Sequence, residues 1–97
     1  MSELSFEWSD AKAALNRRKH RVTFEEAVTA FDDELAIDAA DEGHSITEER
    51  RVLIGLSVRL RLLTVVYTER DEQIRLINAR RSTRAEEACY ATNLRGA

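Results

Sequence analysis

The hydrophobic and polar positions of the first part of the chain predict a short strand followed by two helices. Residues 4–8 alternate between apolar and polar, as the half-buried residues of a strand do. Apolar residues then recur every three or four positions in residues 10–19 and 24–31, which is the spacing of one helix face. Ser9 and Thr23 precede these two stretches, and both side chains suit the N-cap of a helix.

The rest of the chain predicts four strands and a final helix. Alternating runs rich in β-branched and apolar residues occur at residues 35–39, 51–58, 62–68 and 74–79. Gly55 inside the second of these runs suggests a close approach of another backbone, and Ser82 and Thr83 precede the final helix. The order β-α-α-β-β-β-β-α predicts an α+β fold, in which an antiparallel sheet carries the helices on one face.

The last two strands form a predicted hairpin whose turn lies at residues 71–72. Its register pairs Glu69 with Ile74, Tyr67 with Leu76, Val65 with Asn78 and Leu63 with Arg80. One face would then gather a phenol, a carboxylate, an amide and a guanidinium, from Tyr67, Glu69, Asn78 and Arg80. This face is a candidate site. The alternative is that Glu69 and Arg80 form a structural ion pair across the strands.

Length and composition limit the class of protein. With 97 residues, 43% of them hydrophobic, the sequence predicts a single domain over residues 1–97. No apolar run has transmembrane length and no signal-peptide pattern opens the chain, so we expect a cytoplasmic protein. Cys89 is the one cysteine, and neither it nor the two histidines have metal-ligand spacing, so no metal or other cofactor is expected. His44 lies in a polar stretch, residues 41–49, that we expect to be a mobile loop.

The net charge of −3 conceals two halves of opposite sign. Residues 1–49 hold five basic and thirteen acidic residues, whereas residues 50–97 hold ten arginines and five acidic residues. Arginine suits planar, two-point contact with phosphate or carboxylate groups. The second half is therefore either an anion-binding surface or a set of solvated faces and internal ion pairs.

Several stretches, in order along nearly the whole chain, resemble the BrnT-type toxins. They are FEWSDAKAALN at residues 6–16, KH at 19–20, VTFEEA at 22–27, FD at 31–32, His44, ER at 49–50, IG at 54–55, RLL at 61–63, VVYTER at 65–70 and IRLINARRSTR at 74–84. This chain departs from the usual pattern of the family at three positions. Arg21 replaces a glycine, Tyr67 often replaces a histidine, and Asn78 often replaces a serine.

The resemblance implies a RelE-like fold and an endoribonuclease toxin of a type II toxin–antitoxin system. It also implies a cognate BrnA-like antitoxin, typically with a ribbon-helix-helix DNA-binding part, that buries the toxin. The complex would repress the shared operon, so operator DNA would be reached only through the antitoxin. Neither a membrane nor a cofactor is implied.

Metal-independent RNA cleavage needs a base, an acid and cations beside the phosphate. The candidate catalytic residues are Glu69, Arg80, Lys19, His20 and Tyr67. Arg80 would grip phosphoryl oxygens, Glu69 would act as the base, and Tyr67 would orient it. Lys19 and His20 could take part only if their helix end lies over the sheet edge. Their alternative role is to complement the helix dipole.

Four further residues are candidates for RNA binding: Arg61, Arg70, Arg81 and Asn78. If Arg81 points away from the candidate face, it would instead meet a helix or the antitoxin. Two functions follow from the whole sequence. The first is a ribonuclease toxin, and the second is a catalytically weak or inactive partner and corepressor of a ribbon-helix-helix antitoxin.

Overall fold

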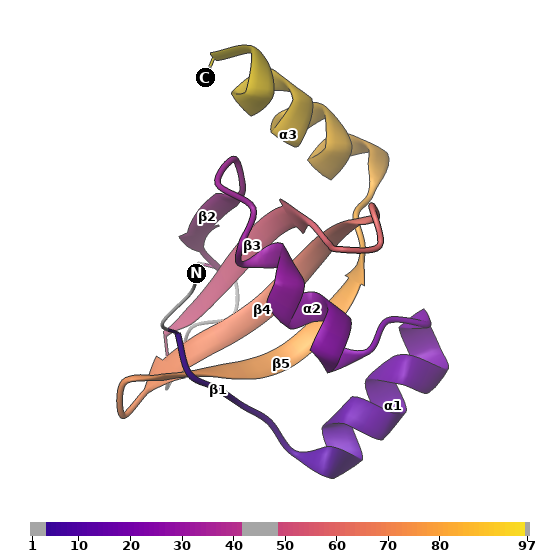
Figure 1. The fold of residues 1–97 in the computed structure, drawn as a ribbon, viewed down its shortest axis with the longest axis vertical. Coiled ribbons are helices and arrows are strands. Elements are labelled where there is room, and N and C mark those ends of the chain that lie inside the picture. Colours follow the sequence, from indigo (N-terminus) through magenta and orange to yellow (C-terminus); the bar gives the residue numbers. More distant parts are fainter. Residues whose placement is uncertain (1–3, 42–48, 97) are drawn as a thin grey trace.

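A computed structural model describes residues 4–41 and 49–96, which form five strands and three helices (Figure 1). The elements are β1 (Phe6–Glu7), α1 (Asp10–His20), α2 (Phe24–Ala30), β2 (Ile37–Ala40), β3 (Arg50–Leu56), β4 (Leu62–Arg70), β5 (Gln73–Arg81) and α3 (Arg84–Gly96). The predicted order of strands and helices is confirmed. Within the described part, no helix is long and apolar enough to cross a membrane. His44 lies outside the described residues.

The five strands form one sheet in the order β1-β5-β4-β3-β2. Strands β2 to β5 are the expected antiparallel meander. The sheet as a whole is mixed, because β1 runs parallel to β5 and pairs through Phe6–Ile74 and Glu7–Arg75. β1 covers only the first part of β5, which leaves the second part of that edge for α1.

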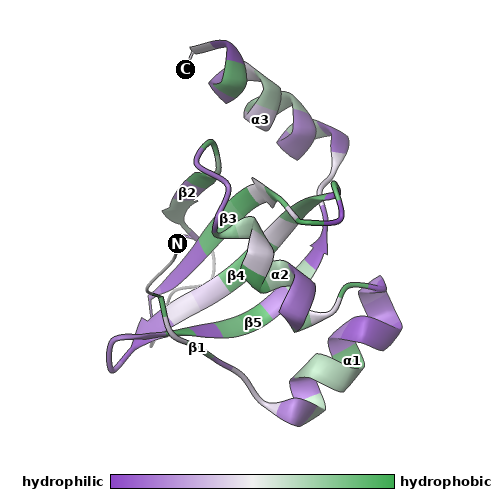
Figure 2. Cartoon of the chain, viewed as in Figure 1, coloured by the Kyte–Doolittle hydropathy of each residue, from purple (hydrophilic) through white to green (hydrophobic). Residues whose placement is uncertain are grey.

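One face of the sheet is filled by α2 and is called the α2 face below. Its buried side chains come from α2, from the connection before α2 and from strands β3 to β5: Val22, Phe24, Ala27, Ala30, Leu53, Leu63, Val65, Leu76 and Ala79. Figure 2 shows apolar residues where α2 crosses these strands. Gly55 is required at this crossing, because a Cβ atom there would lie 2.7 Å from the carbonyl oxygen of Ala30.

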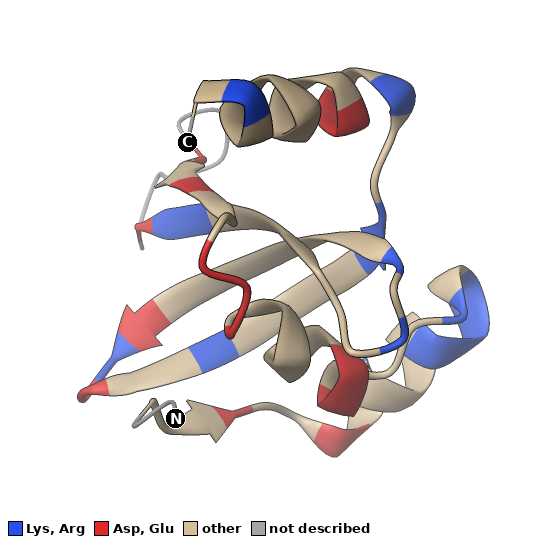
Figure 3. Ribbon diagram, turned by 45° about the horizontal axis from the view of Figure 1, so that its top comes forward, with Lys and Arg blue, Asp and Glu red and all other residues tan. Residues whose placement is uncertain are grey.

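The opposite face of the sheet is called the open face. Since side chains alternate along a strand, it carries Thr64, Val66 and Thr68 of β4. α1 lies along the edge of β5, and α3 approaches the open face at its far end (Figure 3), where Glu86 contacts Thr64. The expectation that the helices cover one face is thus refined. Only α2 packs on the face named after it, whereas α1 lies at the sheet edge and α3 approaches the other face.

A β-bulge in the hairpin decides which face each residue of β5 occupies. The pairs Glu69–Ile74 and Tyr67–Leu76 agree with the predicted register, and Asp71 and Glu72 form the turn with φ angles of 52° and 65°. Beyond Tyr67, however, Val66 pairs with Asn78, so Ile77 has no partner.

The bulge contradicts the second half of the predicted register. Val65 pairs with Ala79 rather than Asn78, and Leu63 pairs with Arg81 rather than Arg80. One extra residue in one strand reverses the faces of all residues that follow it. Asn78 and Arg80 therefore lie on the open face, whereas Ala79 and Arg81 lie on the α2 face.

Candidate functional site

A cleft of about 490 Å³ lies between α1 and the open face of the sheet. It is lined by Lys12, Leu15, Asn16, Lys19, His20, Asp41, Arg50, Val66, Ile77 and Asn78. Three of the residues singled out in the sequence meet here, namely Lys19, His20 and Asn78. Lys12 and Arg50 add further positive charge, and Asp41 is the one carboxylate that the described residues contribute to the lining.

Asn16 fixes α1 against the sheet and thereby forms one wall of this cleft. Its side chain is 4% exposed. Its Nδ2 donates to the carbonyl oxygens of Ala79, at 2.8 Å, and Val22, at 2.9 Å, and its Oδ1 accepts from the Ala79 N–H at 3.0 Å. The amide thus pairs with the edge of β5 where β1 has ended. The end of α1 therefore lies over the sheet edge. This is the condition under which Lys19 and His20 could take part in catalysis.

Both ends of α1 are capped by its own sequence. The hydroxyl of Ser9 accepts from the N–H of Lys12 at 3.3 Å, which confirms the predicted N-cap. At the other end, the N–H of Arg21 donates to the carbonyl of Arg17 at 2.9 Å. Arg21 has φ 59° and ψ 32°, a left-handed conformation that glycine adopts more readily. This is the position at which the resemblance to the BrnT-type toxins implied a glycine.

The floor of the cleft depends on the β-bulge. Ile77 and Val66 give it an apolar surface, and Asn78 adds an amide. No sequence pattern in β5 marks the bulge directly, but the pattern of α1 does indicate which of its residues line the cleft. Lys12, Leu15, Asn16 and Lys19 follow the i, i+3, i+4, i+7 spacing of one helix face. That spacing would have identified Lys12 and Asn16 as partners of Lys19.

Arg80 lies on the open face but is held by α3. Its guanidinium donates to both carboxylate oxygens of Glu86, at 2.8 and 2.9 Å. Glu86 also accepts from the Thr64 hydroxyl and from the N–H of Thr83, and the Thr83 hydroxyl accepts from the N–H of Glu86, which completes a capping box. The bond from Arg80 is the largest cause that lowers the pKa of Glu86, to about 2. Arg80 therefore grips a carboxylate in this structure, and it does not line the cleft.

Tyr67 and Glu69 lie away from the cleft, so the predicted four-residue face is wrong. Tyr67 is 2% exposed on the α2 face and packs edge-on against Phe31. Its hydroxyl donates to Asp38 at 2.5 Å. Burial, and then this bond, raise the pKa of Tyr67. Glu69 is exposed near the hairpin turn and lines a small hollow with Arg51.

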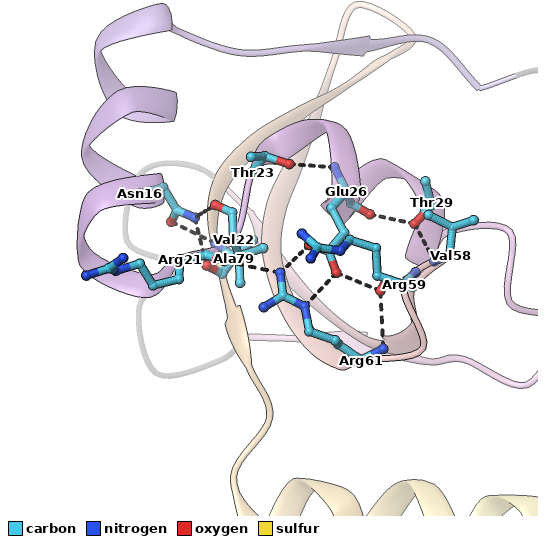
Figure 4. A network of polar contacts seen from close by, with 11 residues as sticks. Asn16, Arg21, Val22, Thr23, Glu26, Thr29, Val58, Arg59, Arg61 and Ala79 are labelled. Carbon is cyan, nitrogen blue, oxygen red and sulfur yellow. Dashed lines mark hydrogen bonds and ion pairs between the residues drawn. The ribbon is translucent and has the colours of Figure 1, made fainter.

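The remaining candidate arginines also lie outside the cleft. Arg61 forms a two-point ion pair with the buried carboxylate of Glu26 (Figure 4). The bond from Arg61 is the largest cause of the lowered pKa of Glu26. Arg81 is exposed opposite Leu63, and Arg70 is exposed at the end of β4.

Among the residues that the structure describes, no group of three or more His, Cys, Asp or Glu side chains could hold a metal ion.

Comparison with known proteins relates the chain to a protein family and to a solved structure. The family model described as "Ribonuclease toxin, BrnT, of type II toxin-antitoxin system" matches residues 8–86. A crystal structure of the Brucella abortus ribonuclease toxin, BrnT, superposes with a TM-score of 0.64 at 17% sequence identity, covering 84% of this chain and 99% of that one. At this identity the superposition shows a common fold. No curated protein matches the chain.

Proposed function

Because the chain belongs to the BrnT family of ribonuclease toxins of type II toxin–antitoxin systems, we propose that it cleaves RNA in the cleft between α1 and the open face. The observation that carries this proposal is the meeting of Lys19, His20 and Asn78 around one cavity. Lys19 and His20 come from the end of α1 and Asn78 comes from β5, and the buried Asn16 amide and the β-bulge bring them together.

The proposed reaction is an internal displacement at phosphorus. The 2′-oxygen attacks the adjacent phosphorus and forms a new P–O bond, while the bond to the 5′-oxygen breaks. One proton leaves the 2′-hydroxyl and one reaches the 5′-oxygen, so the products are a 2′,3′-cyclic phosphate and a free 5′-hydroxyl. The reaction consumes and releases no net protons, and it transfers no electrons to another molecule. It needs no metal ion if side chains stabilise the phosphoryl oxygens.

The lining of the cleft offers each group that this reaction requires. Histidine is the side chain type that exchanges protons most readily near neutral pH, so His20 is the proposed acid or base. Among the residues that the structure describes, Asp41 supplies the only carboxylate of the lining, and it is the proposed second proton carrier. Lys19 and Lys12 would stabilise charge on the phosphoryl oxygens, and Asn78 would donate a hydrogen bond to one of them.

This proposal revises the roles inferred from the hairpin. Glu69 and Tyr67 are left out because they lie on the α2 face or at the hairpin turn. Arg80 is left out of the residues proposed to contact the phosphate, because its guanidinium already donates to both carboxylate oxygens of Glu86. For the partners, we propose RNA as the substrate and a cognate DNA-binding antitoxin of the BrnA kind as the inhibitor.

The test is cleavage of RNA by purified protein in the presence of EDTA. Wild type should produce ends with 2′,3′-cyclic phosphate, and His20→Ala and Lys19→Ala should each slow cleavage at least about 100-fold. Arg95→Gln is the control, because Arg95 is an exposed residue in the last turn of α3.

Three results would count against parts of this proposal. Intact RNA with the wild-type protein would favour the alternative of an inactive partner and corepressor. Cleavage that EDTA abolishes would contradict metal independence. Growth inhibition that co-expression of the neighbouring antitoxin gene does not relieve would contradict the toxin–antitoxin pairing.

A further inference from the structure

A second basic surface lies on the side of α1 that faces away from the cleft. Arg17, Arg18 and Arg21, with Ala14, line a surface hollow of about 730 Å³. We call these three arginines the arginine shelf. An α-helix has 3.6 residues per turn, so positions 14, 17 and 18 lie opposite positions 12, 16 and 19 of the cleft, and Arg21 follows directly after the helix. The end of α1 therefore separates two basic surfaces by the width of one helix, about 10 Å.

The arginines of the shelf have no acidic partner among the described residues. All three are exposed, and none forms an ion pair there. Glu25 shares a neighbouring hollow with Arg17 without an ion pair. Five other arginines form ion pairs with acidic residues that the structure describes: Arg51, Arg59, Arg61, Arg75 and Arg80. The shelf is thus a concentration of uncompensated charge in a protein whose net charge is −3.

Stabilisation of the helix dipole does not explain the whole shelf. Arg17 and Arg18 lie in the last turn of α1, where positive charge is favourable. Arg21 lies beyond that turn in a left-handed conformation, where a side chain is unfavourable and glycine is preferred. A role in binding would account for an arginine at a position where the backbone conformation disfavours any side chain.

The backbone of Arg21 is held in place from both directions. Its N–H donates to the Arg17 carbonyl at 2.9 Å, and its carbonyl accepts from the Arg61 guanidinium at 3.1 Å. Glu26 in turn accepts hydrogen bonds from the Arg61 guanidinium (Figure 4). The side chain of Arg21 takes no part in these bonds, so it projects from a fixed point and is available to a ligand.

We propose that Arg17, Arg18 and Arg21 bind the phosphate backbone of an RNA strand that crosses the end of α1 into the cleft. Guanidinium groups bind phosphate through two parallel hydrogen bonds. Among the described residues that line the hollow, none is an apolar anchor larger than Ala14, whereas protein interfaces draw their affinity from buried aromatic and aliphatic anchors. A polyanion therefore fits this surface better than a folded protein. The inference rests on the proposed function only in naming the polyanion as RNA.

The experiment measures binding of a short, single-stranded 2′-O-methyl RNA, which has no 2′-hydroxyl to attack and stays intact. For single strands, the logarithm of the binding constant falls with the logarithm of the salt concentration by about 0.7 per phosphate contact. Arg18→Gln should make this slope shallower by about 0.7, and the combination Arg17→Gln, Arg18→Gln and Arg21→Gly by about 2. Arg95→Gln is the matched control, because it removes the same charge from the last turn of another helix.

Arg21→Gly separates binding from folding. It removes a side chain from an unfavourable backbone conformation, so the melting temperature should not fall while the salt slope becomes shallower. A salt slope unchanged by the triple substitution would overturn the inference, even if the wild type cleaves RNA. So would loss of antitoxin binding with unchanged RNA binding, which would make the shelf a protein interface. A wild type that binds through the shelf but cleaves no RNA would overturn only the proposed function.

Discussion

The side-chain amide of Asn16 bonds the first helix to the edge of the sheet. It forms three hydrogen bonds with the backbone of Ala79 and Val22, as an extra strand residue would. All three residues are buried, so no solvent can replace these bonds when the amide is lost. The position of Lys19 and His20 over the cleft therefore depends on a residue that carries no charge.

Asn16→Leu should destabilise the protein by about 3 kcal/mol. Leucine has a similar volume, but it leaves one N–H and two carbonyl groups buried without partners, and each such group costs about 1–3 kcal/mol. Urea denaturation measures the change. The control is Asn93→Leu, because the amide of Asn93 donates to the Leu35 carbonyl at an exposed position and its loss should cost less than about 1 kcal/mol. Equal losses for the two variants would contradict the structural role of Asn16.

Tyr67 and Asn78 provide a second test at the level of single residues. Tyr67→Phe removes the bond to Asp38 on the α2 face, so stability should fall by about 1 kcal/mol while RNA cleavage stays unchanged. Asn78→Ala removes a proposed donor from the cleft and should slow cleavage at least about tenfold. Single-turnover cleavage rates distinguish the two. If Tyr67→Phe slowed cleavage as much as Asn78→Ala, this would contradict the placement of the site on the open face.

At the scale of elements, local sequence patterns predicted the helices, strands and caps well, but they predicted the pairing of the strands only in part. The order of elements, the N-caps at Ser9 and Thr23, and the hairpin turn could all be inferred, because each depends on residues close in sequence. The β-bulge could not be inferred in the same way, because alternation alone does not reveal an unpaired residue. One physical warning was present: the regular register put Arg80 beside Leu63, which is fully buried.

The attachment of α3 predicts a dependence of stability on pH. Tyr90 is the only buried residue of α3, so Glu86 and its partners carry much of the contact with the sheet. The pKa of Glu86 is lowered from 4.5 to about 2, chiefly by Arg80. Because the folded pKa is the lower one, the stabilisation is present above pH 4.5 and is lost as the pH falls towards 2.

Comparison of wild type with Glu86→Gln isolates this effect from the other carboxylates. The wild type should be more stable by about 2 kcal/mol at pH 7, and the difference should shrink between pH 5 and pH 2. Urea denaturation at several pH values gives both quantities. A difference that stays constant over this range would show that the Arg80–Glu86 pair does not stabilise the fold through charge.

At the scale of the whole molecule, the charges are separated in space as well as in sequence. Figure 3 shows Lys and Arg gathered where α1 ends and where β5 leads into α3. Several of these arginines are neutralised by Glu26 and Glu86, whereas the arginine shelf is not. A protein with a net charge of −3 can therefore still attract a polyanion, provided that the polyanion approaches the end of α1.

This arrangement predicts that salt weakens RNA binding without slowing the chemical step. With three phosphate contacts at the arginine shelf, a fourfold rise in salt concentration should raise KM about 20-fold. The value of kcat should change little, because the groups proposed to act in the cleft are already in place once RNA is bound. Steady-state cleavage at several salt concentrations measures both, and the triple shelf variant should have a much weaker salt dependence than Arg95→Gln. If KM instead fell as salt rose, repulsion by the net negative charge would govern the encounter, and the separation of charge would have no part in RNA recognition.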